Sequence, residues 1–352
     1  MNEIAENFDS WLINNGPAAL VIRELLVPVE GADGVFFPAT FAPSEDNKIF
    51  EGGYNIDKVL DGNVCLVDSV GSQANRIEPI FMKDAYDKLV PQIMIKAGKK
   101  RVNLLEAGHR AGDALARCST LQQELHDAFI TLLDGDAEPL ARIAPTSLVF
   151  GAWDSRDTQA KLPRLIDSKI RAFNVQKLTR SANYLVQQQL DYVKEGLLSE
   201  PANETEKKLF SKRGYLNALA SATHGGVIAT GGIRRDAILH LAALRLLKSS
   251  TDEKTMALRR YILGLSLTAL TATAPGYLRQ GCNLVPDIEK PPEFTLVHCD
   301  GRREGARITH DDALAYAKST ASAFGVASAR EVDFSKEAAK KDVADATKKK
   351  GK

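Results

Sequence analysis

Short strand-like segments alternate irregularly with helical segments along this chain of 352 residues. Residues 18–31 are rich in aliphatic and β-branched residues and end at a turn, whereas 256–273 and 309–324 have helical apolar spacing. The short strands are too many, and the alternation too uneven, for a clean doubly wound sheet. The sequence therefore predicts an α+β fold or a split βαβ sheet.

The charge is nearly balanced, with 46 basic and 45 acidic residues. The balance is uneven along the chain, because residues 335–352 hold seven lysines and only three acidic residues. This tail lacks large apolar residues, so we expect a folded domain over 1–333 and a disordered Lys-rich tail over 334–352. A uniformly basic protein is excluded, and any nucleic acid would have to bind along local basic stripes.

The common motifs for metals, nucleotides and nucleophiles are absent. The six histidines never form HExxH, no GxSxG or P-loop occurs, and the four cysteines form no CxxC pair. We therefore expect no metal and no cofactor, and reduced cysteines in a cytoplasmic protein. The uncharged run at 261–278 contains threonines and a Pro–Gly break, which favours a buried helix over a membrane span.

The stretch CLVDSVGSQANRIEP, residues 65–79, begins as a buried strand and turns into an unusually polar helix start. Asp68 or Ser69 could simply cap that helix. Capping does not explain the hydroxyl, amides and guanidinium that follow, which could contact phosphates, ribose hydroxyls and base edges. These candidate RNA contacts are Ser72, Gln73, Asn75 and Arg76.

The densest basic stretch of the expected folded part lies at 154–180. We expect a short helix over 161–172, in which Arg164 and Arg171 share one face. Arginine suits phosphate because its planar fork binds two oxygens at once. The alternative is a solvated face with ion pairs to Asp157 and Asp167. The basic residues are Arg156, Lys161, Arg164, Lys169, Arg171, Lys177 and Arg180.

Two further segments could contact an anion. Residues 224–249 are predicted as strand, glycine turn and helix, so the amides at 231–232 would converge on an anion beside Arg234 and Arg235. A plain tight turn is the alternative. At 106–119 another helix start carries His109, a contact candidate, and Arg110, which we expect to pair with Asp113.

Four segments together resemble a known family: LVDSVGSQANRIEP, HRAGDALARCS, SRDTQAKLPRLIDSKIRA and GGVIATGGIRRD. They are similar to the backbone subunit, of the RAMP superfamily, of type I-G (formerly I-U) CRISPR Cascade effector complexes. The resemblance covers roughly residues 18 to 325 in order. It implies a single RRM-like (ferredoxin-like) palm with inserted fingers and a thumb, and either 187–213 or 30–60 could be the thumb.

The resemblance also implies a function. Such a subunit is not an enzyme: it binds the CRISPR guide RNA (crRNA) without sequence choice. Copies stack head to tail into a helical filament, and the guide pairs with the target DNA strand in antiviral defence. Partners would be neighbouring copies, other Cascade subunits and a recruited helicase–nuclease. The alternatives are an RNA-processing ribonuclease of the same superfamily and a phosphate-binding metabolic enzyme.

By position, the resemblance places RNA contacts in three of the four segments. His109 and Arg171 join them as candidates from the residue patterns. The complete predicted RNA-binding set is Ser72, Gln73, Asn75, Arg76, His109, Arg156, Thr158, Lys161, Arg164, Arg171, Gly231, Gly232, Arg234 and Arg235.

Overall fold

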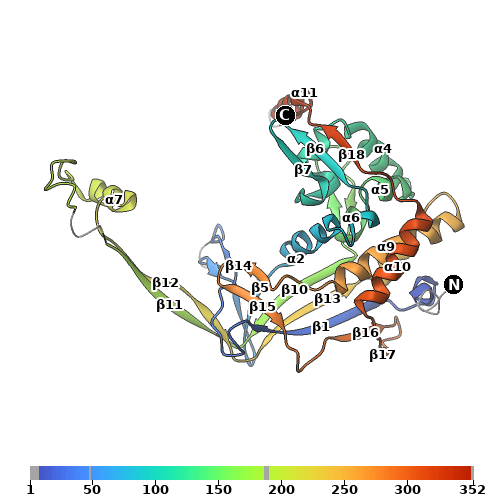
Figure 1. Ribbon diagram of the computed structural model, residues 1–352, viewed down its shortest axis with the longest axis horizontal. Coiled ribbons are helices and arrows are strands. Elements are labelled where there is room, and N and C mark those ends of the chain that lie inside the picture. The colour runs from blue at the N-terminus through green and yellow to red at the C-terminus, as the bar shows by residue number, and fades with distance from the viewer. Residues whose placement is uncertain (1–7, 47–48, 186–189, 350–352) are drawn as a thin grey trace.

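The computed structural model describes residues 8–46, 49–185 and 190–349, and is built on one curved antiparallel sheet (Figure 1). Its four central strands lie in the spatial order β16, β1, β13, β10, which is fourth, first, third, second along the chain. This is the order of a ferredoxin-like βαββαβ unit, so the predicted α+β class is confirmed. The strands are β1 (Ala19–Pro28), β10 (Ile166–Phe173), β13 (Ile233–Leu239) and β16 (Glu293–Val297).

Further strands widen this sheet on both sides. Beyond β10 lie β5 (Gly62–Asp68) and β4 (Ile56–Val59), and on the other side β15 (Cys282–Pro286) pairs with the last residues of β1. On the side of β1 the outermost strands are β14 (Tyr277–Arg279) and β17 (Arg303–Gly305), and on the side of β10 the sheet ends at β4.

Helices cover one face of the sheet. They are α2 (Val70–Ile77), α8 (Leu241–Leu244), α9 (Asp252–Thr271) and α10 (His310–Phe324). Burial alternates strictly along β10 and β13, and the buried Leu20, Ile166 and Leu239 belong to the same core as Leu263 of α9. The opposite face of β10 and β13 is only partly buried, which is the pattern expected of an antiparallel sheet covered on one side.

A first insertion lies between α2 and β10. It contains a small sheet in which β6 (Ile93–Ala97) lies between β7 (Lys100–Asn103) and the C-terminal β18 (Arg330–Asp333). Its other elements are η2 (Glu78–Met82), η3 (Asp87–Leu89), η4 (Leu104–Glu106), η5 (Arg110–Gly112), α3 (Ala114–Arg117), α4 (Gln122–Leu133), α5 (Glu138–Ile143), α6 (Pro145–Phe150), β8 (Ala152–Trp153) and β9 (Lys161–Leu162).

A second insertion, between β10 and β13, forms a long arm. Strands β11 (Val175–Tyr184) and β12 (Ala218–Ala229) pair antiparallel and project away from the body, and α7 (Glu204–Arg213) lies at the far end (Figure 1). The polar stretch 187–213 is therefore at the tip of this arm, except for 187–189, which lie outside the described residues. The segment 30–60, apart from 47–48, which lie outside the described residues, instead lies beside the root of the arm, where Phe36 pairs with Val227 of β12. It forms β2 (Thr40–Phe41), β3 (Gly53–Tyr54) and β4.

Two predicted helices are strands instead. Most of 161–172 belongs to β10, because Ile166, Ser168 and Ile170 alternate with charged residues at period two and are all buried. The segment after the glycine turn is β13, in which Ile233, Ala237 and Leu239 face the core. Both segments follow the strand period, so the helical predictions were wrong.

The chain termini differ from the expectation as well. Residues 336–349, expected to be disordered, form α11 (Lys336–Lys349), because Ala, Lys and Glu favour helix and Arg117 holds Asp342 at 3.0 Å. Near the other end lies η1 (Ser10–Leu12). Among the described residues, no helix combines the length and the apolar character needed to cross a bilayer.

Candidate nucleic-acid interface

The buried carboxylate of Asp68 organises the start of α2. Asp68 is the last residue of β5, and its side chain is fully buried. Its carboxylate accepts hydrogen bonds from Gln73 Nε2 (2.7 Å), Arg76 Nε (3.1 Å) and Arg279 Nη2. The helix is capped by the next residue, since Ser72 N lies 3.3 Å from Ser69 Oγ. Asp68 is therefore a structural anchor for two guanidiniums.

Both guanidiniums remain partly accessible, with 35% of the Arg76 side chain and 23% of the Arg279 side chain exposed. Two cations share one carboxylate, so the group carries a net positive charge. Fixed guanidiniums of this kind suit phosphate oxygens. No sequence pattern pointed to Arg279, because it lies 211 residues from Asp68 in a strand without other clustered basic residues.

Gln73 does not lie on the surface. Its side chain is buried, its amide nitrogen donates to Asp68, and its Oε1 accepts from Ser168 Oγ of β10 at 3.1 Å. These bonds hold α2 on the sheet. By contrast, Asn75 and Arg76 are exposed and Ser72 is partly exposed.

Arg110 joins the first insertion to α2. It is buried, and its Nε lies 2.7 Å from Glu78 Oε2, while Nη2 donates to Asn75 Oδ1 and Nη1 to Gly151 O, both at 3.2 Å. The predicted Arg110–Asp113 pair was therefore wrong. Asp113 instead caps α3 by accepting from Leu115 N.

Burial sets the proton affinities of this pair. It raises the pKa of Glu78 to about 7, although the charge of Arg110 opposes the rise. Burial also lowers the pKa of Arg110, and the nearby charge of Arg164 lowers it further, against the opposing effect of Glu78. Because Asn75 Oδ1 accepts from Arg110, this pair also fixes the amide of an exposed residue beside Arg76.

The segment 151–164 lies next to these residues. A Cβ on Gly112 would come within 2.8 Å of Trp153 O, and one on Gly151 within 2.9 Å of Arg164 Cγ. Arg156, Lys161 and Arg164 are exposed, and Lys161 Nζ lies 5.7 Å from the centre of the Trp153 ring. Thr158 has a structural role, because its hydroxyl and amide both donate to Asp154.

His109 is the most exposed candidate, with 84% of its side chain accessible and Nδ1 3.4 Å from Asp113 Oδ2. The preceding residue, Gly108, lies close to Asn75, since a Cβ on Gly108 would be 4.0 Å from Asn75 Nδ2. The exposed residues contributed by α2, by the loop before η5 and by the turn before β10 are here called the α2 surface. They are Asn75, Arg76, His109, Lys161 and Arg164.

The diglycine turn is not an anion cradle at a helix start. It bends the chain from β12 into β13, and the Gly231 amide already donates to Phe173 O at 2.9 Å. Gly232 has a φ of +82°, which glycine adopts readily, and its carbonyl accepts from Phe173 N. The predicted strand and glycine turn are therefore present, but the predicted helix after the turn is the strand β13.

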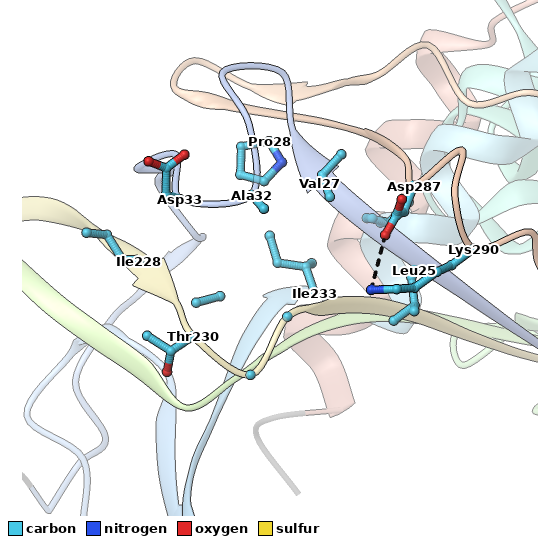
Figure 2. Close-up of a pocket in the computed structure, with 14 residues that line it drawn as sticks. Leu25, Val27, Pro28, Ala32, Asp33, Ile228, Thr230, Ile233, Asp287 and Lys290 are labelled. Carbon is cyan, nitrogen blue, oxygen red and sulfur yellow. Dashed lines mark ion pairs between the residues drawn. The ribbon is translucent and has the colours of Figure 1, made fainter.

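A cavity of about 700 Å³ borders this bend at the root of the arm. Figure 2 shows Val27 and Pro28 of β1 on one side of it and Thr230 and Ile233 on the other. Most of its wall is aliphatic, and its charged Lys290 is paired with Asp287 at 3.6 Å. The bend therefore lacks the convergent cations expected of a phosphate loop.

The two arginines after the bend point to opposite faces of the sheet. Arg235 faces α2, is buried, and pairs with Glu24 at 2.6 Å. Arg234 lies on the open face, pairs with Asp236 at 2.8 Å and sits 4.9 Å from the centre of the Phe173 ring. Arg171 of β10 is the cross-strand neighbour of Arg234. The predicted set is thus split, and only Arg235 joins the α2 side.

The α2 surface can bind an anionic chain through fixed cations and amides. Groups of three or more His, Cys, Asp or Glu placed to hold a metal ion do not occur in the described ranges 8–46, 49–185 and 190–349. The α2 surface presents guanidinium, ammonium and amide groups, which are the kinds of group that contact phosphate and ribose oxygens.

Comparison with known proteins gives one family match. Residues 20–177 match the model of a family described as CRISPR-associated protein GSU0053 (Cas_GSU0053). The match runs from β1 into β11 and includes every residue of the α2 surface. No curated protein matches the chain. The predicted resemblance to a CRISPR-associated family is confirmed over these residues.

Proposed function

We propose that this chain, CRISPR-associated by its family match over residues 20–177, is a non-catalytic backbone subunit that binds guide RNA. Copies would assemble head to tail along one RNA in a type I-G Cascade complex, and the RNA would pair with target DNA. The ferredoxin-like sheet with two insertions supports this proposal, since it matches the palm, fingers and thumb that the resemblance implies.

One observation carries the proposal. Residues from three distant segments, around 75, 109 and 161–164, meet on the α2 surface and are exposed there. Their contacts run through Arg110, which bonds both Asn75 and Gly151. A structural role alone would not require this meeting of exposed cations, whereas a ribose–phosphate strand would use it.

The arm suits assembly. It projects from the body as a paired ribbon (Figure 1). Its tip carries exposed apolar side chains, including Leu197 and Leu209. We infer that the arm is the thumb and that it reaches the RNA and the palm of the next copy. A near-neutral subunit can coat RNA in this way if each copy neutralises only a few phosphates.

The test is co-expression with a CRISPR array, followed by size-exclusion chromatography. The proposal expects the protein to elute in one large particle that contains guide-length RNA. A monomer without RNA would contradict it. Incubation of the pure protein with labelled repeat RNA tests the ribonuclease alternative, because cleavage would contradict the non-catalytic role.

A further inference from the structure

A second cavity, of about 380 Å³, lies between α2, the end of α9 and the β14–β15 hairpin. Its size is in the range of small-ligand pockets. Arg76 and Asn75 of the α2 surface form one part of its wall, and residues 272–276, which link α9 to β14, form another. The cavity therefore opens beside the proposed RNA contacts.

The wall is mainly apolar. Ile77 and Ile80 lie on the α2 side, and Leu26 and Leu284 are contributed by the sheet. Tyr277 stands at the wall with 58% of its surface exposed. An exposed tyrosine beside an aliphatic wall offers a flat partner to a planar ring, and base–aromatic stacking tolerates any base.

Polar groups occur at two places. The buried ion pair of Glu24 and Arg235 borders the cavity, so a carboxylate acceptor and a guanidinium donor are both present at its wall. Arg76 also lines the cavity, and it shares the carboxylate of Asp68 with Arg279, which lies two residues after Tyr277 in β14. Cations thus lie next to the aromatic wall.

We propose that this cavity receives one unpaired base of the bound RNA, with Tyr277 stacked on the base and Arg76 and Arg279 on the adjoining phosphate. The inference rests on the proposed function and adds a base-binding site to it. The combination of an aromatic ring, an apolar wall and a fixed pair of guanidiniums is what a nucleotide needs. A free mononucleotide has the same chemistry and is the alternative source.

The test compares two single-stranded RNAs of the same length, one intact and one with abasic riboses, by fluorescence anisotropy. Tyr277→Ala should weaken the binding of the intact RNA roughly tenfold. The same variant should bind the abasic RNA as the wild type does. Tyr277→Phe, which keeps the ring, is the matched control and should bind both RNAs like the wild type.

Two outcomes overturn this proposal alone: unchanged binding of intact RNA by Tyr277→Ala, or equal losses for both RNAs. Tight binding of AMP by the wild type, together with unchanged RNA binding by Tyr277→Ala, would assign the cavity to a free nucleotide. If the wild type binds neither RNA, the proposed function itself fails. Thermal melting of each variant checks that the fold is intact.

Discussion

Arg110 Nε lies 2.7 Å from Glu78 Oε2, and the two side chains are only 5% and 2% exposed. The pair connects the first insertion to the end of α2, and Arg110 also holds the exposed Asn75. Because φ at Arg110 is +54°, in the left-handed region, the backbone there accepts strain to place this guanidinium. A stability measurement can test its importance.

Arg110→Met should destabilise the protein by about 3–5 kcal/mol at pH 8, because the carboxylate of Glu78 is left buried and unpaired. The loss should be smaller at pH 6, where Glu78 takes up a proton. Urea unfolding at both pH values measures this difference. Lys96→Met, which breaks an exposed pair with Glu331, should cost far less stability than Arg110→Met, and the same amount at either pH, because water screens this pair.

The sign of the pH effect follows from the raised pKa of Glu78. Its pKa is 4.5 in the reference state and about 7 in the folded protein. Between pH 4.5 and about 7, the carboxyl group of Glu78 is therefore mostly protonated in the folded protein and mostly ionised in the unfolded protein. The resulting contribution to stability is fully present below pH 4.5 and is lost as the pH rises through about 7. Equal losses for Arg110→Met at pH 6 and pH 8 would contradict this interpretation.

The diglycine bend should tolerate no side chain at Gly231. A Cβ there would lie 2.9 Å from the backbone oxygen of Phe173, so Gly231→Ala must displace the root of the arm. We expect a loss of about 1–3 kcal/mol in the free energy of unfolding. Gly305→Ala is the control, because its Cβ would meet nothing within 4 Å. Equal stability of the two variants would argue against a close approach at the bend.

Thiol labelling tests the core. Cys299 is exposed, whereas Cys65, Cys118 and Cys282 are buried. Burial also raises the pKa of Cys65 to about 12 and that of Cys282 to about 11, which suppresses their thiolates. One thiol per chain should react quickly with DTNB in the native protein, and all four after unfolding. Two or more fast native thiols would be inconsistent with this core.

Local patterns predicted part of the site. The strand that turns into a polar helix at 62–77 was correct, as was the exposure of Asn75 and Arg76. The basic residues at 161–164 stand out in the sequence, but the helix predicted over 161–172 is mostly the strand β10. The roles of Gln73 and Arg110 could not be predicted, because their partners, Ser168 and Glu78, are set by the tertiary fold.

The two strands that were predicted as helices were missed for a different reason. In β10 and β13, charged residues alternate with small or aliphatic ones, which is the pattern of a strand. Around β10, the spacing of seven residues between Arg164 and Arg171 suggested one face of a helix and obscured this alternation. Once β13 is a strand, Arg234 and Arg235 must face opposite sides. The resemblance implied the ferredoxin-like sheet, but the local patterns did not identify two of its four central strands and so could not give the side of each arginine.

The central claim is that exposed cations beside α2 hold RNA phosphates. The direct test uses a triple alanine variant of the three exposed basic residues of the segment 151–164: Lys161 and Arg164 of the α2 surface, and Arg156, which precedes them. A charge-matched control replaces three exposed basic residues from other parts of the surface, Lys248, Lys254 and Arg302.

The decisive measurement is the affinity for single-stranded RNA as a function of salt concentration. Each phosphate contact contributes about 0.7 to the slope of log K against log salt, so the triple variant should lower the slope by about 2. The control should keep the slope of the wild type. A slope that is unchanged in the triple variant, or lowered equally in the control, would contradict the claim.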